Sequence, residues 1–413
     1  MNLLLWIFTI LFCLALTDFV TDRYPRLQNQ IYHIAFMTTY ILFTIKYYYG
    51  PDIVHYVPFY ETIQQPKDIL NGNYNGIFEI GYAFFCSVIK QIGISFWGMT
   101  AIISTIYFIA IYMLFKQIPK RKTFALLILV ILDHILIFST YRQCLAVSCF
   151  IFMVLSFWKK KILLSMIWCV ISVTLHKSAI FISIPALLLL NITSIKVDRH
   201  IYSALILILI AMLAIPASDS ASAIIRLLPL DNETIRSITH HLSLARNIQM
   251  IFIIYMLYMI AIVYYRSIRY TNTVTEKHFR WIILAGALII VALYQYYYIL
   301  NRIRSYLLPF LITYIFIIVN ERKSILCGAS ANIRSAANII RQTAILATLV
   351  YCVHFSISLY KSQKNLKGNV YATSTILELH NHSEEYLKKR QIRTAQIYWA
   401  YDFMHNNNNK IQQ

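Results

Sequence analysis

Long apolar segments separated by clusters of lysine and arginine are the feature that most constrains how this chain can fold. The segments are ~15–20 residues long, the length that a helix needs to cross a hydrocarbon core of about 30 Å. Charged residues make up only 13% of the chain, about half of their share in soluble domains. The sequence therefore predicts an all-α fold: a polytopic helical membrane protein with about twelve transmembrane helices.

The predicted transmembrane segments follow one another along most of the chain. They are Leu3–Leu16, Ile31–Tyr48, Ser95–Phe115, Phe124–Ser139, Leu145–Trp158, Ile162–Leu175, Ala179–Leu190, Ile201–Ala217, Ile248–Tyr265, Trp281–Leu300, Tyr306–Val319 and Ile340–Tyr360. The amphipathic segment Phe78–Gly93 is expected to lie at the membrane surface as an interfacial helix. We expect residues 1–360 to form the integral membrane domain. Residues 361–413 would form a polar tail, helical from Ser383 to Ala400 and disordered at its end.

The basic clusters orient the chain in the membrane. Lys and Arg number 37 against 17 Asp and Glu, a net charge of +20, and most of this excess is expected in cytoplasmic loops. Nucleic acid is therefore not an expected partner. Assigning Lys120–Lys122 and Lys159–Lys161 to the cytoplasm leaves several polar segments on the outer face. These are the loops 50–95 and 218–247, two hairpin tips at Arg142 and His176, and a turn at Asn301–Arg304 between two spans.

Arg142 and His176 are predicted to reach the same depth at the outer edge of the bilayer. Lys161 lies 19 residues after Arg142 and 15 residues before His176, which at 1.5 Å per residue gives roughly 28 and 22 Å. Positive charges on the outer side run against the topology bias, and at this depth they are costly unless they are paired or face a cavity. We therefore expect a functional role for Arg142, His176 and the adjacent Lys177. The alternative is that they are ordinary residues at loop tips.

Further ionisable and aromatic residues lie on the same predicted face. Lys46, Asp52 and Tyr56 flank a turn at Gly50-Pro51, a pattern that an aromatic belt with a snorkelling lysine would also explain. Glu79 is either a site carboxylate or only a favourable partner for the dipole of a helix start. The remaining candidates are Gln143, Arg246, Arg302 and Arg304.

Neither a metal ion nor another cofactor is expected. The seven cysteines are scattered and show no CxxC spacing. The pair His240-His241 has no carboxylate at a matching spacing. Arginine binds phosphate oxygens through two parallel hydrogen bonds. A basic pocket built from Arg142, Lys177, Arg302 and Arg304 would therefore suit a pyrophosphate.

Several short motifs resemble, in the same order, those of the EpsG/Wzy-type polysaccharide polymerases. They are Lys46-Tyr47-x-x-Gly50-x-Asp52-x-x-x-Tyr56, Glu79-x-Gly81-Tyr82, Arg142-Gln143-x-x-Ala146, His176-Lys177-Ser178-Ala179 and Arg302-Ile303-x-x-Tyr306. Two positions depart from the family pattern: Lys46 replaces an arginine and Ile80 replaces a proline. The resemblance spans residues 46–306 and does not extend to the tail.

The resemblance implies a glycosyltransferase that polymerises undecaprenyl-pyrophosphate-linked oligosaccharide repeat units into a surface polysaccharide, such as O-antigen, capsule or exopolysaccharide. It implies a location in the bacterial cytoplasmic (inner) membrane, with the active site facing the periplasm or exterior. The expected partners are the lipid-linked oligosaccharide and the lipid bilayer, and a chain-length regulator is a further candidate. The implied catalytic residues are Asp52, Glu79, Arg142 and His176, with the base among Asp52, Glu79 and His176. The implied substrate-binding residues are Lys46, Tyr56, Gln143, Lys177, Arg246, Arg302 and Arg304.

Two other functions remain open at this point. A lipid-linked oligosaccharide flippase or another transporter would also have about twelve spans, but its ionisable residues would collect at the midplane and its halves would repeat. Asp133-His134 is the exception in this chain: it lies partway along a predicted span, where it serves either a transport path or helix packing. A membrane O-acetyltransferase is the second alternative.

Overall fold

The computed structural model describes most of the N-terminal half of the chain and separate parts of the rest. The described ranges are 3–21, 23–47, 52–74, 76–192, 297–320 and 331–365, with shorter pieces within 254–289, 374–375 and 383–393. Arg246, His240, His241 and the predicted span Ile201–Ala217 lie outside the described residues. The described residues are mostly helical, and their strands are one pair of two residues each.

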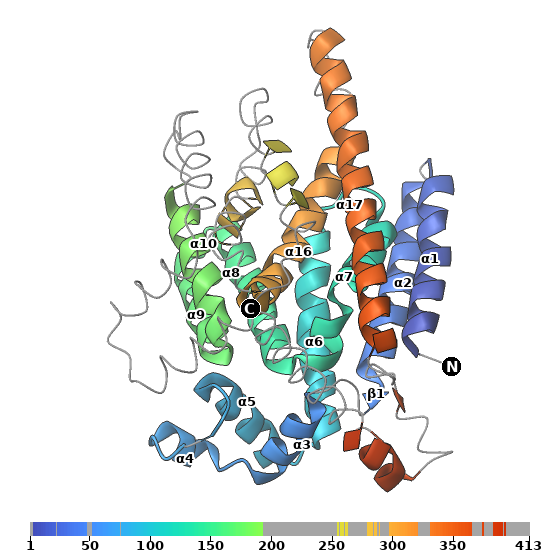
Figure 1. Ribbon diagram of the computed structural model, residues 1–413. Coiled ribbons are helices and arrows are strands. Elements are labelled where there is room, and N and C mark those ends of the chain that lie inside the picture. The colour runs from blue at the N-terminus through green and yellow to red at the C-terminus, as the bar shows by residue number, and fades with distance from the viewer. Residues whose placement is uncertain are drawn as a thin grey trace, which may run out of the picture.

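Long helices stand side by side in a bundle (Figure 1). They are α1 (Leu3–Val20), α2 (Pro25–Thr44), α6 (Phe96–Phe115), α7 (Lys122–Ser139), α8 (Tyr141–Trp158), α9 (Ile162–Leu175), α10 (Ile180–Ile192), α16 (Tyr297–Val319) and α17 (Ala331–Asn365). Within the bundle α8 packs against α6 and α9, and α7 packs against α1, α2 and α16. Most of the buried residues of these helices are apolar, and the apolar ones form one continuous core, with buried polar residues among them.

Three short helices lie across one end of the bundle (Figure 1). They are α3 (Ile53–Thr62), α4 (Pro66–Leu70) and α5 (Ile80–Gln91). α5 falls within the segment predicted as an interfacial helix, and it packs against α9 as well as against α3 and α4. The helices that surround this end of the bundle therefore come from widely separated parts of the sequence.

Most of the predicted spans that the structure describes agree with helices within a few residues, and the exceptions include the spans on either side of the predicted turn at Asn301–Arg304. Three helical segments among the described residues are long and apolar enough to cross a membrane: Phe96–Phe115, Tyr141–Trp158 and Arg302–Val319. Four shorter apolar helical segments accompany them, including Ile162–Leu175. The helical class of the fold is confirmed, while the total of about twelve spans stays a prediction.

The predicted turn at Asn301–Arg304 is wrong. These residues belong to α16, which runs without a break from Tyr297 to Val319. The two arginines interrupt the apolar pattern but not the helix, because each charge is accommodated without a break in the backbone. The Arg302 side chain is exposed, and the Arg304 side chain is buried in the polar cluster described below. Polar residues within one continuous helix were thus mistaken for the end of a span.

The C-terminal part of the chain returns to the end of the bundle where α2 finishes. Strand β1 (Lys46–Tyr47) pairs antiparallel with β2 (Ser374–Thr375), so Lys46 lies opposite Thr375. Farther on, residues 384–390 are helical and the Ser383 hydroxyl accepts a hydrogen bond from the Tyr386 backbone at 3.3 Å. The sequence predicts this serine cap, and residues 392–393 of the predicted tail helix are also helical, while residues 391 and 394–400 lie outside the described residues.

Asp133 and Arg304 form a buried polar cluster between α7, α16 and α17. The Ser305 hydroxyl donates to Asp133 Oδ1 at 2.8 Å, and Arg304 Nη1 approaches the Tyr351 hydroxyl at 3.4 Å. The neighbouring His134 bonds through Nδ1 to the backbone of its own helix at 3.0 Å. These contacts lie between packed helices and favour helix packing for Asp133-His134, while the transport path stays an untested alternative.

Removing the carboxylate of this cluster should destabilise the bundle, because a buried cation left without a counter-charge is costly. We expect Asp133→Ala to lower the free energy of unfolding by about 3 kcal/mol. The double variant Asp133→Ala/Arg304→Met should recover at least half of that loss, because it removes the unpaired charge. Unfolding of both purified proteins by titration with a denaturing detergent would measure the difference. Equal destabilisation of the single and double variants would contradict this interpretation.

Candidate functional site

The Glu79 carboxylate joins three segments at the end of the bundle that carries α3, α4 and α5. Arg142 Nη1 forms an ion pair with Glu79 Oε2. The other carboxylate oxygen, Oε1, accepts from His176 Nδ1 at 3.1 Å and from the Lys177 backbone N–H at 3.2 Å. The side chains of Glu79 and His176 are only 9% and 5% exposed. The two predicted hairpin tips therefore contact the same carboxylate, which is consistent with the equal depth predicted for them.

The local sequence places Glu79 where it can reach both tips. Glu79 is the extended residue before α5, with φ −65° and ψ 144°, so its carboxylate projects away from the helix that follows. Two residues later, Gly81 packs directly on the last turn of α9. A Cβ at Gly81 would lie 2.7 Å from the backbone carbonyl of Thr174. Only glycine permits this approach, and the approach brings the start of α5 beside His176.

His176 lies at the junction where α9 ends and the chain turns back. It has an extended backbone with φ −156° and ψ 120°, and the short helix η1 (Lys177–Ala179) follows it. The break leaves the Lys177 backbone N–H free to donate to Glu79. Lys177 itself, in contrast, is an exposed residue.

Arg142 lies in the first turn of α8, against an aromatic wall. Its Nε donates to the Tyr56 hydroxyl at 3.3 Å, and the guanidinium carbon lies 4.3 Å from the centre of the Phe78 ring. The Tyr56 ring also packs against Tyr82 and Tyr141. Because Nε and Nη1 are engaged, Arg142 is held in one orientation, and its Nη2 makes no hydrogen bond with a described residue.

Asp52 and Arg302 complete the charged residues at this end. Asp52 precedes α3, and its carboxylate lies in the electrostatic field of Arg142 and Arg302. The buried Gln143 side chain donates to the Arg302 backbone carbonyl at 2.7 Å. This bond ties the start of α8 to α16 and keeps the exposed Arg302 side chain near the site.

The two carboxyl groups respond differently to burial. For Glu79, burial would raise the pKa, but the hydrogen bond from His176 and the charge of Arg142 outweigh it and hold the pKa well below its usual range. For Asp52, burial dominates and raises the pKa above its usual value, although Arg142 opposes the rise. Glu79 is therefore a firmly ionised anchor and a weak base.

Two predicted binding residues lie away from this cluster. Lys46 is only 2% exposed; its ammonium donates to the Ile137 carbonyl, lies 3.3 Å from Ser104 Oγ and covers the Tyr141 ring. Arg304 belongs to the buried cluster with Asp133 described above. Neither position is explained by contact with a ligand at the surface, and substrate binding by these two residues stays a prediction.

Ser178 and Tyr306 were not predicted as site residues. Their hydroxyls adjoin each other beside Arg302, and neither makes a well-formed hydrogen bond with a described group. Both residues lie inside the motifs His176-Lys177-Ser178-Ala179 and Arg302-Ile303-x-x-Tyr306. The signal was thus present, but a serine and a tyrosine in apolar surroundings are more often packing residues.

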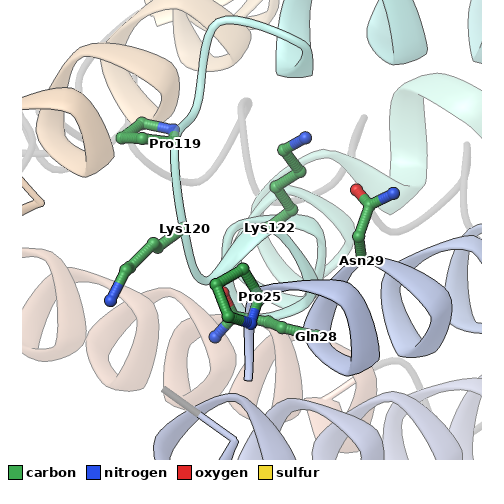
Figure 2. A pocket seen from close by; sticks show the side chains of 6 residues that line it. All are labelled: Pro25, Gln28, Asn29, Pro119, Lys120 and Lys122. Carbon is green, nitrogen blue, oxygen red and sulfur yellow. The ribbon is translucent and has the colours of Figure 1, made fainter. Parts of the chain in front are cut away.

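A small cavity of about 160 Å³ lies at the opposite end of the bundle (Figure 2). It is lined by residues at the start of α2, in the link between α6 and α7, and at the start of α7: Pro25, Gln28, Asn29, Pro119, Lys120 and Lys122. α7 begins beside it at Lys122 and ends at Ser139, close to the start of α8 where Arg142 lies. Among the residues that the structure describes, no group of three His, Cys, Asp or Glu side chains could hold a metal ion.

The comparison with protein families gives one match. The EpsG family matches residues 29–333, which is well over half of the chain and includes every residue of the Glu79 cluster. No curated protein and no solved structure matches the chain.

The close contact at Gly81 leads to a direct test of the site's assembly. We expect Gly81→Ala to lower the free energy of unfolding by about 2 kcal/mol, because the added methyl group would force α5 away from α9. The matched control is Gly98→Ala in α6, where the added Cβ would meet the Ile94 Cγ2 methyl group, a side-chain atom, instead of the backbone of another helix. Thermal unfolding of the two detergent-purified variants would measure the difference. A Gly81→Ala protein as stable as Gly98→Ala would contradict the close packing.

Proposed function

Because the chain belongs to the EpsG family, we propose that it is a membrane polysaccharide polymerase that joins undecaprenyl-pyrophosphate-linked oligosaccharide repeat units. In this reaction the sugar at the reducing end of the growing chain leaves its pyrophosphate and is captured by a hydroxyl of the next lipid-linked unit. The products are a longer lipid-linked glycan and free undecaprenyl pyrophosphate. The surface polysaccharide could be an O-antigen, a capsule or an exopolysaccharide.

The reaction needs two kinds of group at one place. Fixed positive charge must stabilise the departing pyrophosphate while the sugar becomes oxocarbenium-like. A base must also accept the proton of the attacking hydroxyl. Both kinds of group lie at the end of the bundle that carries α3 to α5.

The observation that carries the proposal is the state of Arg142. Its guanidinium is held by Tyr56 and Glu79, and its Nη2 makes no hydrogen bond with a described residue. Arg302 has an exposed side chain, and its backbone carbonyl accepts a hydrogen bond from the Gln143 side chain. A guanidinium held in one orientation, with a second exposed arginine side chain at the same end of the bundle, suits the oxygens of a pyrophosphate, and arginine keeps its charge at any physiological pH.

The orientation in the membrane follows from the basic loops. We assign the end that carries the turns after α6 and α8 to the cytoplasm, because Lys116–Lys122 and Lys159–Lys161 lie there. The Glu79 cluster then faces the outside of the bacterial cytoplasmic membrane, where lipid-linked repeat units are polymerised. The bilayer holds the lipid tail of the substrate, and a chain-length regulator is a candidate protein partner.

Reconstitution tests this function and separates it from its alternatives. The natural lipid-linked repeat unit, extracted from a strain that lacks this protein, would be placed in liposomes with the purified chain. We expect a ladder of longer glycans and release of undecaprenyl pyrophosphate. Movement of the lipid-linked unit between leaflets without longer glycans would identify a flippase instead, and acetylation of the glycan would identify an acetyltransferase.

Replacing Arg142 should abolish polymerisation without unfolding the protein. Arg142→Lys keeps the positive charge beside Glu79 but loses the planar guanidinium, so we expect a 10²- to 10³-fold lower rate, roughly the cost of losing one preorganised donor. The control is Arg26→Ala, an exposed residue at the opposite end of the bundle, which should polymerise normally. Normal chain lengths from a folded Arg142→Lys protein would contradict the assignment.

A further inference from the structure

His176 carries a buried nitrogen that no described residue satisfies. The residue is 4% exposed, and Nε2 makes no hydrogen bond with a described residue. Buried polar atoms in proteins nearly always have a partner, so an unpaired one calls for an explanation. The other ring nitrogen, Nδ1, is bonded to Glu79 Oε1, so the ring orientation is fixed.

The bond to Glu79 determines which nitrogen carries the proton. Glu79 is ionised and can only accept a hydrogen bond, so Nδ1 must carry its hydrogen. Burial lowers the pKa of His176 below its usual value, although Glu79 opposes this effect. The charges that face the ring come from three neighbouring elements: Glu79 before α5, Arg142 in α8 and Arg302 in α16. The ring is therefore neutral near pH 7, and Nε2 presents a lone pair.

Two more unsatisfied hydroxyls lie on the adjoining segments. Ser178 follows His176 by two residues in η1, and Tyr306 lies in α16, which packs against η1. Ser178 is 6% exposed and Tyr306 is fully buried; their hydroxyls lie next to each other, and neither makes a well-formed hydrogen bond with a described group. A buried imidazole nitrogen without a described partner, together with two adjoining hydroxyls on neighbouring segments, indicates a site for a hydroxyl-bearing ligand.

We infer that His176 is the general base of the polymerase and that Nε2, with the Ser178 and Tyr306 hydroxyls, binds the attacking hydroxyl of the acceptor sugar. This assignment rests on the proposed function and selects one base from three candidates. Glu79 is excluded as the base because both of its oxygens are engaged. Glu79 instead acts as a positioning residue, because it fixes the tautomer and the orientation of the ring.

The step balances without a further reactant. The acceptor O–H proton passes to His176 Nε2 as the acceptor oxygen forms a bond to the anomeric carbon of the donor sugar. The bond between that carbon and the pyrophosphate oxygen breaks, and its electron pair stays on the departing pyrophosphate, beside Arg142 and Arg302. The imidazolium formed is stabilised by the Glu79 carboxylate and later releases its proton to water.

His176→Asn provides the sharpest test, because asparagine can keep a donor near the position of Nδ1 but has no Nε2. In the liposome assay we expect a 10²- to 10³-fold lower kcat, in the range that general bases contribute. In the wild type, kcat/KM should fall toward low pH as the base becomes protonated (the acid limb of the profile). His176→Asn should lack this fall. The matched variant Asp52→Asn should keep the limb of the wild type. A limb retained in His176→Asn, or lost only in Asp52→Asn, would overturn the inference.

Glu79→Gln gives a second readout that a purely structural role would not change. Glutamine still accepts the Nδ1 hydrogen but removes the negative charge that raises the pKa of His176. The acid limb should therefore move to lower pH. An unshifted limb in a folded, active Glu79→Gln protein would count against His176.

Two further variants address the acceptor subsite. Ser178→Ala and Tyr306→Phe should raise the KM for the acceptor unit several-fold and change kcat little, and an unchanged KM in both would overturn the subsite.

Added imidazole should partly restore polymerisation by His176→Ala, and lack of rescue in folded protein would contradict the role of Nε2. If the wild type makes no polymer in this assay, the proposed function itself fails. If the wild type and His176→Asn are both fully active, the proposed function stands and only the assignment of His176 as the general base fails.

Discussion

The site depends on one carboxylate that is shared by three segments. Glu79 binds Arg142 at the start of α8 and both His176 and the Lys177 backbone at the end of α9. Without it, a guanidinium and an imidazole at the end of an apolar bundle would lack a common partner, and buried charges without partners are costly. The rest of the arrangement serves this contact: Gly81 lets α5 approach α9, and Tyr56 and Phe78 enclose the guanidinium.

Ionisable groups occur at two depths of the bundle, and they do different things. The cluster of Asp133 and Arg304 lies between packed helices, where Ser305 and Tyr351 contact it, so it serves to hold α7, α16 and α17 together. The cluster around Glu79 lies at one end, and it has an arginine edge and an imidazole nitrogen that no described residue contacts by a hydrogen bond, beside two adjoining hydroxyls. A set of fixed but unsatisfied groups is what binding of a polar substrate requires.

Much of this could be predicted from the sequence, because apolar length and basic clusters are strong signals in membrane proteins. The helix Ile162–Leu175 agrees residue for residue with its prediction, and counting residues from Lys161 placed Arg142 and His176 at one depth. The identity of their shared partner could not be predicted, because an acid before a helix equally suits the helix dipole. The turn expected at Asn301–Arg304 failed for a related reason: a continuous helix can carry polar residues when packing satisfies them. The burial of Lys46 depends on contacts with α6 and α7 that sequence spacing does not show.

Electron cryomicroscopy of the full-length protein with undecaprenyl pyrophosphate tests the central claim most directly. The account predicts pyrophosphate density within hydrogen-bonding distance of Arg142 and Arg302, with the lipid tail running along the outer half of the bundle. Density at the opposite end, in the cavity lined by Lys120 and Lys122 (Figure 2), would contradict the account, because the Glu79 cluster would then have no substrate to act on.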